Sequence, residues 1–364
     1  MAKPLLRSLV PDRLAEVVAA CGAEPYRARQ LATWLYGYDA LDWDELRNLP
    51  RALRASLAEG WDLQGLQPVE RQVGGDGTRK FLFRLRDGQT VESVIIPMES
   101  HATFCLSTQV GCAMACRFCA TARGGLVRNL EAGEILEQVA HLRRDLRADP
   151  VPGHGDRQFN AVFMGMGEPL DNWDALPDTL STMLAPDGLG MSKRRVQVST
   201  SGPGEGLRRL LELAPGTGLT LSLGGTTDEE RKRLMPVPGR TGLAEVLELG
   251  RLYARQSGRR TTIAWVLIAG STDGADQARR LAKLAAGGLF KVNLIPLNPL
   301  DDDRQAPPAP DVVLAFQGIL DAAGIDTTVR LSGGRDIAAA CGQLRRRREA
   351  GGSAPGKQDG GRPD

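Results

Sequence analysis

The sequence contains little cysteine, little histidine and few aromatic residues. Among its 364 residues there are 6 cysteines and 3 histidines, and aromatic residues make up 5%. So few cysteines exclude a disulfide scaffold, and we expect a reducing compartment in which thiolates stay available to metals. The chain also lacks a hydrophobic run long enough to cross a membrane, and its start, MAKPLLRSLVPDRL, lacks the apolar segment of a signal peptide. The composition therefore predicts a cytoplasmic protein with no membrane partner.

Neither sign of charge is in excess, since 46 lysines and arginines stand against 44 aspartates and glutamates. The formal net charge of +2 neither requires nor excludes a nucleic-acid partner. Basic residues cluster at 143–144, 193–195 and 345–348, and each such cluster is more often a solvated face than a phosphate site. The length and the 42% of hydrophobic residues allow one large α/β domain and a small accessory domain.

The first part of the chain has the apolar spacing of helices. We predict three helices, over 11–21, 28–38 and 43–57, the last of which ends before Gly60. These helices would form a small accessory domain spanning residues 1–70.

Residues 79–97 alternate between apolar and polar on both sides of the dipeptide Asp87-Gly88. Such a dipeptide between alternating runs predicts a β-hairpin. We place this hairpin in a connector spanning residues 71–100. Glu92 falls in its second strand, and the default interpretation is a surface glutamate on the polar face.

Strands and helices alternate in the remainder of the chain. We predict strands at 103–109, 159–165, 195–200, 218–223, 261–269 and 290–296. Six βα units predict an α/β fold with a parallel sheet that curves into a partial or full barrel, with its site at the carboxyl ends of the strands. This barrel domain would span 101–345, with 131–147 as its clearest helix and 325–331 as an edge strand. The end, 346–364, is predicted to be a disordered tail.

Three cysteines, Cys112, Cys116 and Cys119, stand close together in a C-x3-C-x2-C spacing. Three thiolates at this spacing can hold three irons of a 4Fe-4S cluster and leave the fourth iron open to a small molecule. A structural zinc site would need a fourth ligand, for which Cys105 and His141 are the candidates. Inert core cysteines are the third interpretation.

Small and polar residues follow several of the predicted strands. After the second strand come Gly167 and Glu168, a glycine that lets the backbone approach a ligand and a carboxylate that can pair with an ammonium group. Ser199, Ser222 and Asn298 stand at the ends of the third, fourth and sixth strands. Each alone is compatible with ordinary turn chemistry, whereas together they predict a polar pocket at one end of the barrel.

Two further cysteines, Cys105 and Cys341, stand alone in mostly apolar surroundings. Such a cysteine is usually packed in the core. Its reactivity depends on pKa and exposure, neither of which the sequence shows.

Together these motifs resemble the RlmN/Cfr family of radical S-adenosylmethionine (radical SAM) RNA methyltransferases, and most closely its RlmN branch. The resemblance runs from residue 14 to residue 345. It rests on VESVIIP around Glu92, CLSTQVGCAMACRFCATA, FMGMGEPLDN, VSTSG, NLIPLNP and DIAAACGQL. The resemblance implies an incomplete (βα)6 radical SAM barrel with a helical amino-terminal extension that binds RNA.

The resemblance also implies an activity, the methylation of an adenine carbon, which is C2 in the RlmN branch and C8 in the Cfr branch. The substrate would be 23S rRNA, with tRNA as a second candidate. This carbon is too weak a nucleophile to attack SAM directly, so a radical route with a 4Fe-4S cluster and two SAM per turnover is chemically sensible. An external electron donor would reduce the cluster, and we expect a monomer.

The same motifs imply roles for single residues. The three clustered cysteines would ligate the metal cluster. Cys341 would carry a methyl group, Cys105 would resolve the protein–RNA adduct and leave a transient disulfide with Cys341, and Glu92 would accept a proton. The SAM site would consist of Gly167, Glu168, Ser199, Ser222, Leu223, Gly224 and Asn298.

Three segments depart from the family pattern. Gly224 replaces a usual histidine, the stretch after Asn298 lacks a usual glycine and aromatic residue, and residues 331–334 replace a more basic segment. The competing interpretations are adenine C8 methylation or another RNA target, an RNA-binding protein with structural zinc, and a radical SAM enzyme that acts on a small molecule or peptide.

Overall fold

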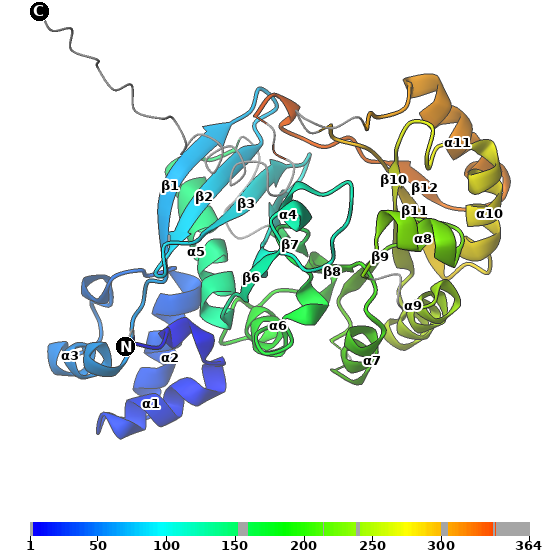
Figure 1. The fold of residues 1–364 in the computed structure, drawn as a ribbon. Helices are drawn as coiled ribbons and strands as arrows, with labels where there is room; N and C mark the ends of the chain where they lie inside the picture. Colours follow the sequence, from blue (N-terminus) through cyan, green and yellow to red (C-terminus); the bar gives the residue numbers. More distant parts are fainter. Residues whose placement is uncertain are drawn as a thin grey trace, which may run out of the picture.

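The scaffold is a ten-stranded sheet in the order β1-β2-β3-β4-β7-β8-β9-β10-β11-β12 (Figure 1). The computed structural model describes residues 3–151, 159–213, 215–237, 241–299, 305–337 and 339. The strands of the sheet are Leu66–Val73 (β1), Arg79–Leu85 (β2), Thr90–Pro97 (β3), Ala102–Cys105 (β4), Phe159–Phe163 (β7), Val196–Thr200 (β8), Gly218–Ser222 (β9), Thr261–Leu267 (β10), Phe290–Pro296 (β11) and Thr327–Val329 (β12). A separate two-stranded ribbon consists of Gln109–Gly111 (β5) and Leu126–Asn129 (β6).

The helices divide into an amino-terminal group and a group that belongs to the barrel. The first group is Leu14–Ala20 (α1), Tyr26–Ala32 (α2) and Arg51–Gly60 (α3). The second group is Ala120–Arg123 (α4), Ala132–Ala148 (α5), Leu176–Leu184 (α6), Gly204–Leu213 (α7), Asp228–Leu234 (α8), Leu243–Ser257 (α9), Ala275–Ala285 (α10) and Pro310–Ala322 (α11). None of the helices in the described part of the chain is both long and apolar enough to cross a membrane.

Within the large sheet, the strands from β4 through β7 to β12 are parallel neighbours in chain order. Helices connect them, so the chain repeats βα units along this part of the sheet. Antiparallel β1, β2 and β3 extend the sheet beyond β4. Within the described residues β1 and β12 do not pair, so the curved sheet stays open (Figure 1). The predicted α/β class and incomplete barrel are thereby confirmed.

The predicted first barrel strand, 103–109, is divided in the structure. The backbone N–H groups of Thr108 and Gln109 donate to the carbonyl oxygen of Met166, at 2.8 and 3.2 Å, instead of continuing the ladder. The chain therefore leaves the large sheet after β4, and β5 pairs with β6. The other predicted barrel strands agree with the observed ones to within a few residues.

The predicted hairpin is confirmed, because β2 and β3 pair from Arg79↔Ile95 to Arg84↔Thr90. The sequence analysis did not find β1, whose alternating pattern is interrupted by Pro68. The register shifts just after this proline, and an edge strand with a bulge tolerates a residue that has no N–H. The boundary placed at residue 70 falls inside β1, and the division into domains stays a prediction.

The amino-terminal helices differ from their predicted extents. The predicted helix 43–57 is a short 3₁₀ turn, Trp43–Glu45, followed by α3 from Arg51. Pro50 precedes α3, and proline disfavours a helical conformation of the residue before it. The predicted helix 28–38 is α2 continued by a π turn, Thr33–Gly37.

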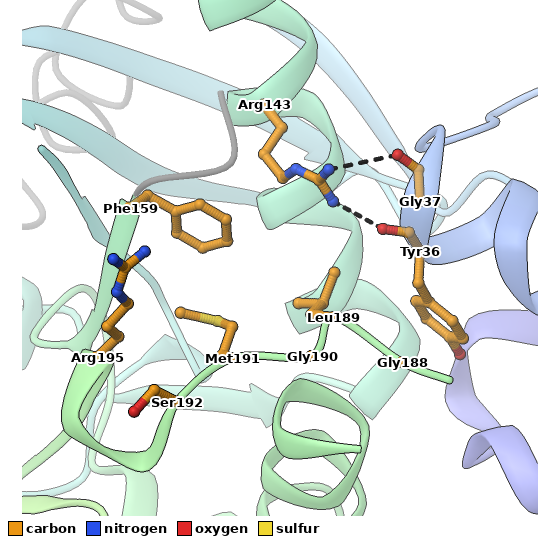
Figure 2. A pocket seen from close by; sticks show the side chains of 10 residues that line it. All are labelled: Tyr36, Gly37, Arg143, Phe159, Gly188, Leu189, Gly190, Met191, Ser192 and Arg195. Carbon is orange, nitrogen blue, oxygen red and sulfur yellow. Dashed lines mark hydrogen bonds between the residues drawn. The ribbon is translucent and has the colours of Figure 1, made fainter. Parts of the chain in front are cut away.

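Buried charges attach the amino-terminal helices to α5. The Arg143 guanidinium donates to the carbonyl oxygens of Tyr36 and Gly37, at 2.7 and 3.3 Å, beside a cavity of about 510 Å³ (Figure 2). Asp39 forms two ion pairs: its Oδ1 lies 3.1 Å from Arg143 Nη1, and its Oδ2 lies 2.8 Å from Arg147 Nη1. The interpretation of 143–144 as a solvated basic face is therefore wrong for Arg143, which is 5% exposed.

Candidate active site at the carboxyl ends of the barrel strands

The three clustered cysteines lie in the loop between β5 and β6. The N–H of Cys112 donates to the carbonyl oxygen of Gly125 at 2.9 Å, which closes the loop at its base. The N–H of Arg117 donates to the carbonyl oxygen of Leu234 at 3.0 Å, which joins the loop to the end of α8. Ala115 has φ of 54°, an uncommon left-handed conformation for alanine. The ribbon and α8 thus fix the bent backbone of the loop that carries the three cysteines.

Burial disfavours the thiolate form of two of these cysteines, Cys112 and Cys116. It raises the pKa of Cys112 to about 12, and the neighbouring charges of Glu168 and Cys119 act in the same direction. Burial raises the pKa of Cys116 as well, with further contributions from Cys119 and Cys112. The three sulfurs are therefore close enough to interact electrostatically. Three thiols in one loop form a donor set that suits an iron–sulfur cluster with one open iron, and binding would displace their protons.

The zinc interpretation has no support from His141. This residue lies on α5, where its ring is tilted against the ring of Phe83 with 5.2 Å between the ring centroids, and its Nε2 lies 3.4 Å from Glu137 Oε1. Ser93, on the face of β3 toward α5, donates to Gln138 at 2.7 Å, so His141 belongs to the outer side of the sheet. In the described ranges no three His, Cys, Asp or Glu side chains converge on a position for a single metal ion.

Glu168 is buried beside the cysteine loop and is 3% exposed. Its Oε2 accepts hydrogen bonds from the N–H and the hydroxyl of Ser201, at 2.8 and 2.7 Å. Its Oε1 accepts from the N–H of Leu170 at 3.1 Å. Burial raises the pKa of Glu168, although these hydrogen bonds oppose the shift. The carboxylate is thus held by neutral donors of its own chain, which the sequence analysis did not anticipate.

The glycines before Glu168 are needed by the fold itself. A Cβ on Gly165 would lie 2.6 Å from backbone atoms of Leu106, and one on Gly167 would lie 2.6 Å from Gln109 Cβ. Gly167 also has φ of 102°, which favours glycine. Close approach to a ligand was the expected reason for a glycine here, whereas in the structure these glycines lie close to the chain that runs from the end of β4 into β5. A role of Gly167 in SAM binding stays a prediction.

Arg231 is a site residue that the sequence analysis missed. Its side chain is fully buried and donates to the carbonyl oxygens of Ser222, Leu223 and Ser201, the first two at 3.1 and 2.7 Å. We call Glu168, Ser201 and Arg231, with these carbonyls, the strand-end network. It connects the carboxyl ends of β8 and β9 next to the cysteine loop. In the sequence Arg231 stands in the charged run DEERKRL, where nothing distinguishes it from exposed neighbours.

Gly224, which follows the strand-end network, leaves no room for a side chain. It has φ of +69°, and a Cβ would lie 2.4 Å from Met235 Sδ. Met235 is buried and packs with Leu234 against Cys116 and Phe118 of the cysteine loop. A histidine at position 224 would therefore require Met235 to move.

Glu92 and Cys105 share one face of the sheet. Val94 is in register with Cys105, and Glu92 is two positions from Val94 on the same strand. Ser93 contacts α5, so Glu92 and Cys105 face the barrel interior. Glu92 is only 2% exposed, so its interpretation as a surface glutamate is wrong: α5 covers one face of β3 and the barrel encloses the other.

Two other residues predicted for the SAM site, Ser199 and Asn298, lie outside the strand-end network. Ser199 lies on β8, two positions before Ser201, and is half-buried. Asn298 follows β11, and its Nδ2 donates to Ser332 Oγ at 2.7 Å. No hydrogen bond within the described ranges joins either of them to the strand-end network. Cys341 and the predicted tail 346–364 lie outside the described residues.

Comparisons with known proteins agree with this geometry. The family model described as the radical SAM superfamily matches residues 106–282, which include the cysteine loop and the strand-end network. The model described as the ribosomal RNA large subunit methyltransferase N-terminal domain matches residues 6–62, the region of the amino-terminal helices.

Full-length relatives extend the match over most of the chain. A dual-specificity RNA methyltransferase RlmN from Anaeromyxobacter sp. is 46% identical over 94% of this chain and 90% of its own length. A probable dual-specificity RNA methyltransferase RlmN from Symbiobacterium thermophilum is 44% identical over 92% of this chain and 90% of its own length. Among solved structures, a radical SAM methyltransferase from Sphaerobacter thermophilus matches with a TM-score of 0.87 and 40% identity, covering 93% of this chain and 98% of that one.

Proposed function

The chain belongs to the RlmN family of radical SAM RNA methyltransferases, and on this premise we propose that it methylates C2 of an adenosine in 23S rRNA. The words "dual-specificity" in the names of the relatives support a second RNA substrate, for which we propose tRNA. An enzyme acting on these RNAs works in the cytoplasm. We expect it to act as a monomer with an external electron donor.

One observation carries the proposal: three mutually interacting thiols, of which Cys112 is buried and Cys116 and Cys119 are half-buried, lie beside the strand-end network. Cys112, Cys116 and Cys119 would hold a 4Fe-4S cluster, which, when bound, supplies the electron for reductive cleavage of SAM. The polar ends of β7, β8 and β9 would bind SAM, including Glu168, Ser199, Ser222, Leu223 and Gly224, with Gly167 and Asn298 completing the site.

The thiol of Cys341 would accept the methyl group of a first SAM, so that a new sulfur–carbon bond forms, the sulfonium–methyl bond breaks and the thiol proton is lost. A second SAM would serve the radical step, which gives two SAM per turnover. After the methylene carbon bonds to adenine, Glu92 would take the proton from C2, and the adduct would lose one electron to the redox partner of the enzyme. The Cys105 thiolate would then attack the sulfur of Cys341: the disulfide forms, the sulfur–methylene bond breaks, and the methylene carbon takes up a proton to become the methyl group of the RNA. An external reductant would afterwards reduce the disulfide. The shared orientation of Glu92 and Cys105 toward the barrel interior supports this division of roles.

The test is anaerobic turnover of reconstituted protein with SAM, dithionite and unmodified rRNA or tRNA fragments, followed by mass spectrometry of the nucleosides. We expect 2-methyladenosine from the wild type and none from Cys341→Ala, because the carrier sulfur is removed. Cys21→Ala, which changes a half-buried cysteine at the end of α1, is the matched control and should stay active.

Other products would separate the alternatives. Formation of 8-methyladenosine would replace the C2 assignment with C8. Formation of 5′-deoxyadenosine without any methyladenosine would keep the radical chemistry and reject the RNA substrate. A protein that takes up zinc and no iron would overturn the proposal altogether.

A further inference from the structure

The segment that follows β12 crosses the open side of the barrel. Near β11 it is held by Asn298 Nδ2, which donates to Ser332 Oγ at 2.7 Å. It then reaches the turn between β1 and β2, where the N–H of Gly334 donates to Asp76 Oδ2 at 2.7 Å. Figure 1 shows this orange segment beside the tip of β1 and β2. The segment thus connects the two margins of the incomplete sheet.

The contact at the β1–β2 turn is reciprocal. Asp76 of the turn accepts from Gly334 of the segment, and Asp336 of the segment accepts from the N–H of Gly75 of the turn at 2.7 Å. Asp76 Oδ1 also accepts from the N–H of Thr78 at 2.9 Å, which shapes the turn. Burial alone would raise the pKa of Asp76, but the hydrogen bonds from Thr78 and Gly334 outweigh it and lower the pKa. Charge-assisted hydrogen bonds of this kind are among the stronger ones in proteins.

The two surfaces fit closely because glycines face each other. A Cβ on Gly333 would lie 2.6 Å from Thr78 Oγ1 and 3.0 Å from Asp76 Oδ2. A Cβ on Gly74 would lie 2.8 Å from Asp336 Oδ1. Side chains at these positions would push the segment away from the turn. We call residues 74–78 together with residues 333–336 the clasp.

Hydrogen bonds to Gly334 also hold the backbone that follows the clasp, up to Ala339. The carbonyl oxygen of Gly334 accepts from the N–H of Ile337 at 3.1 Å and from the N–H of Ala339 at 3.0 Å. Ala339 is therefore fixed relative to the clasp. Cys341 follows two residues later, so the extended chain allows at most about 7 Å between their Cα atoms.

We propose that the clasp positions Cys341 for methyl transfer, with Asp76 and Asp336 as positioning residues. The inference rests on the proposed function, in which the sulfur of Cys341 has to meet both a methyl donor and an adenine. A tethered sulfur reacts faster than one that samples many positions, because the clasp has already removed its freedom of movement. The clasp contains no residue that the family resemblance assigned to the site.

The test compares Asp336→Ala with Asp336→Asn in the full-length, reconstituted protein. Asp336 is exposed, so neither change disturbs the core. Alanine removes the oxygen that accepts the hydrogen bond from the N–H of Gly75, whereas asparagine keeps an amide oxygen that can accept it. With SAM and no reductant, the rate at which the Cys341 peptide gains one methylene mass is followed by mass spectrometry. We expect Asp336→Ala to lower this rate about tenfold and Asp336→Asn to stay within about threefold of the wild type.

A second variant and a second measurement exclude a general structural effect. Gly333→Ala removes no hydrogen-bonding atom but collides with Thr78, and it should slow the methylation like Asp336→Ala. Asp321→Ala, at an exposed position near the end of α11, is the matched control. Hydrogen exchange at the amides of Gly334 and Ala339 should speed up in the clasp variants, while the iron content stays unchanged.

The possible failures are distinguishable. A wild type that never gains a methyl group on Cys341 rejects the carrier assignment, and hence the role of the clasp in it, while hydrogen exchange still reports the contact itself. A wild type that is methylated normally, together with an Asp336→Ala variant of the same rate, overturns the clasp and leaves the proposed function intact.

Discussion

Two buried centres of this protein each contain arginine and a carboxylate but arrange them in opposite ways. At the interface with α5, Asp39 contacts Arg143 and Arg147 directly. In the strand-end network, Arg231 donates to three carbonyl oxygens, and Glu168 accepts only from neutral groups. The first centre neutralises its charges and connects two parts of the chain. The second holds a buried cation and a buried carboxylate beside the cysteine loop with no ion pair between them in the described residues, although the charge of Glu168 still acts on Arg231.

The largest expected effect comes from breaking the first centre. Asp39→Asn removes the negative charge that faces Arg143 and Arg147, and the Arg143 side chain is only 6% exposed. We expect a loss of about 3 kcal/mol in the free energy of unfolding, measured by urea titration. Asp44→Asn, which affects an ion pair whose aspartate is 98% exposed, should change the free energy by less than about 0.5 kcal/mol. Equal effects of the two changes would mean that Asp39 and its arginines do not stabilise the fold.

Breaking the second centre should affect ligand binding more than unfolding. Arg231→Gln removes donors to the ends of β8 and β9, and we expect SAM affinity of the reconstituted protein to fall about tenfold by calorimetry. Arg233→Gln, at an exposed position of the same helix, is the control. The comparison of the two centres would be wrong if Arg231→Gln lowered stability as much as Asp39→Asn and left SAM binding unchanged.

A smaller effect should follow from adding a side chain beside the strand-end network. Gly224→Ala introduces a left-handed alanine and a collision with Met235, so we expect a loss of about 2 kcal/mol in the free energy of unfolding. Gly258→Ala has a nearly identical φ of +67° but no atom within 4 Å of the added Cβ, and isolates the backbone strain at about 1 kcal/mol.

The same pair of variants tests whether the packing around Gly224 could accommodate the histidine that the family usually has at this position. If Gly224→Ala and Gly258→Ala are equally destabilising, the Met235 side chain moves aside at no cost in stability, and Gly224→His should also be tolerated. If Gly224→Ala is the more destabilising, Gly224 and Met235 form one packed unit.

Site residues that lie close together in the sequence could be predicted, whereas features that depend on contacts between distant parts of the chain could not. The cysteine loop was recognisable because Cys112, Cys116 and Cys119 lie within one short loop, so their spacing reflects their geometry. Most barrel strands were also predictable, because apolar runs between helices at regular spacing favour a parallel sheet. In contrast, β1 was missed because Pro68 breaks its local pattern, and its pairing depends on β2.

Burial was the property that the sequence showed least reliably. Glu92, Arg143 and Arg231 occur in polar or charged contexts that predict exposure, yet all three are buried. Each is buried because elements distant in sequence cover it: α5 and the barrel for Glu92, the amino-terminal helices for Arg143, and the ends of β8 and β9 for Arg231. No periodicity within a single segment carries that information.

The fold class, the family and the three-thiol loop follow from the order of the residues alone, because they depend on local periodicity and on the spacing of reactive groups. Which charges are buried, that Glu168 accepts hydrogen bonds from Ser201, and that the clasp joins the two margins of the open barrel became known from the folded chain. The physical reason is that hydrogen bonds and desolvation depend on which atoms meet in space. For Gly75 and Asp336, 261 residues apart in the chain, that meeting exists only once the barrel has formed.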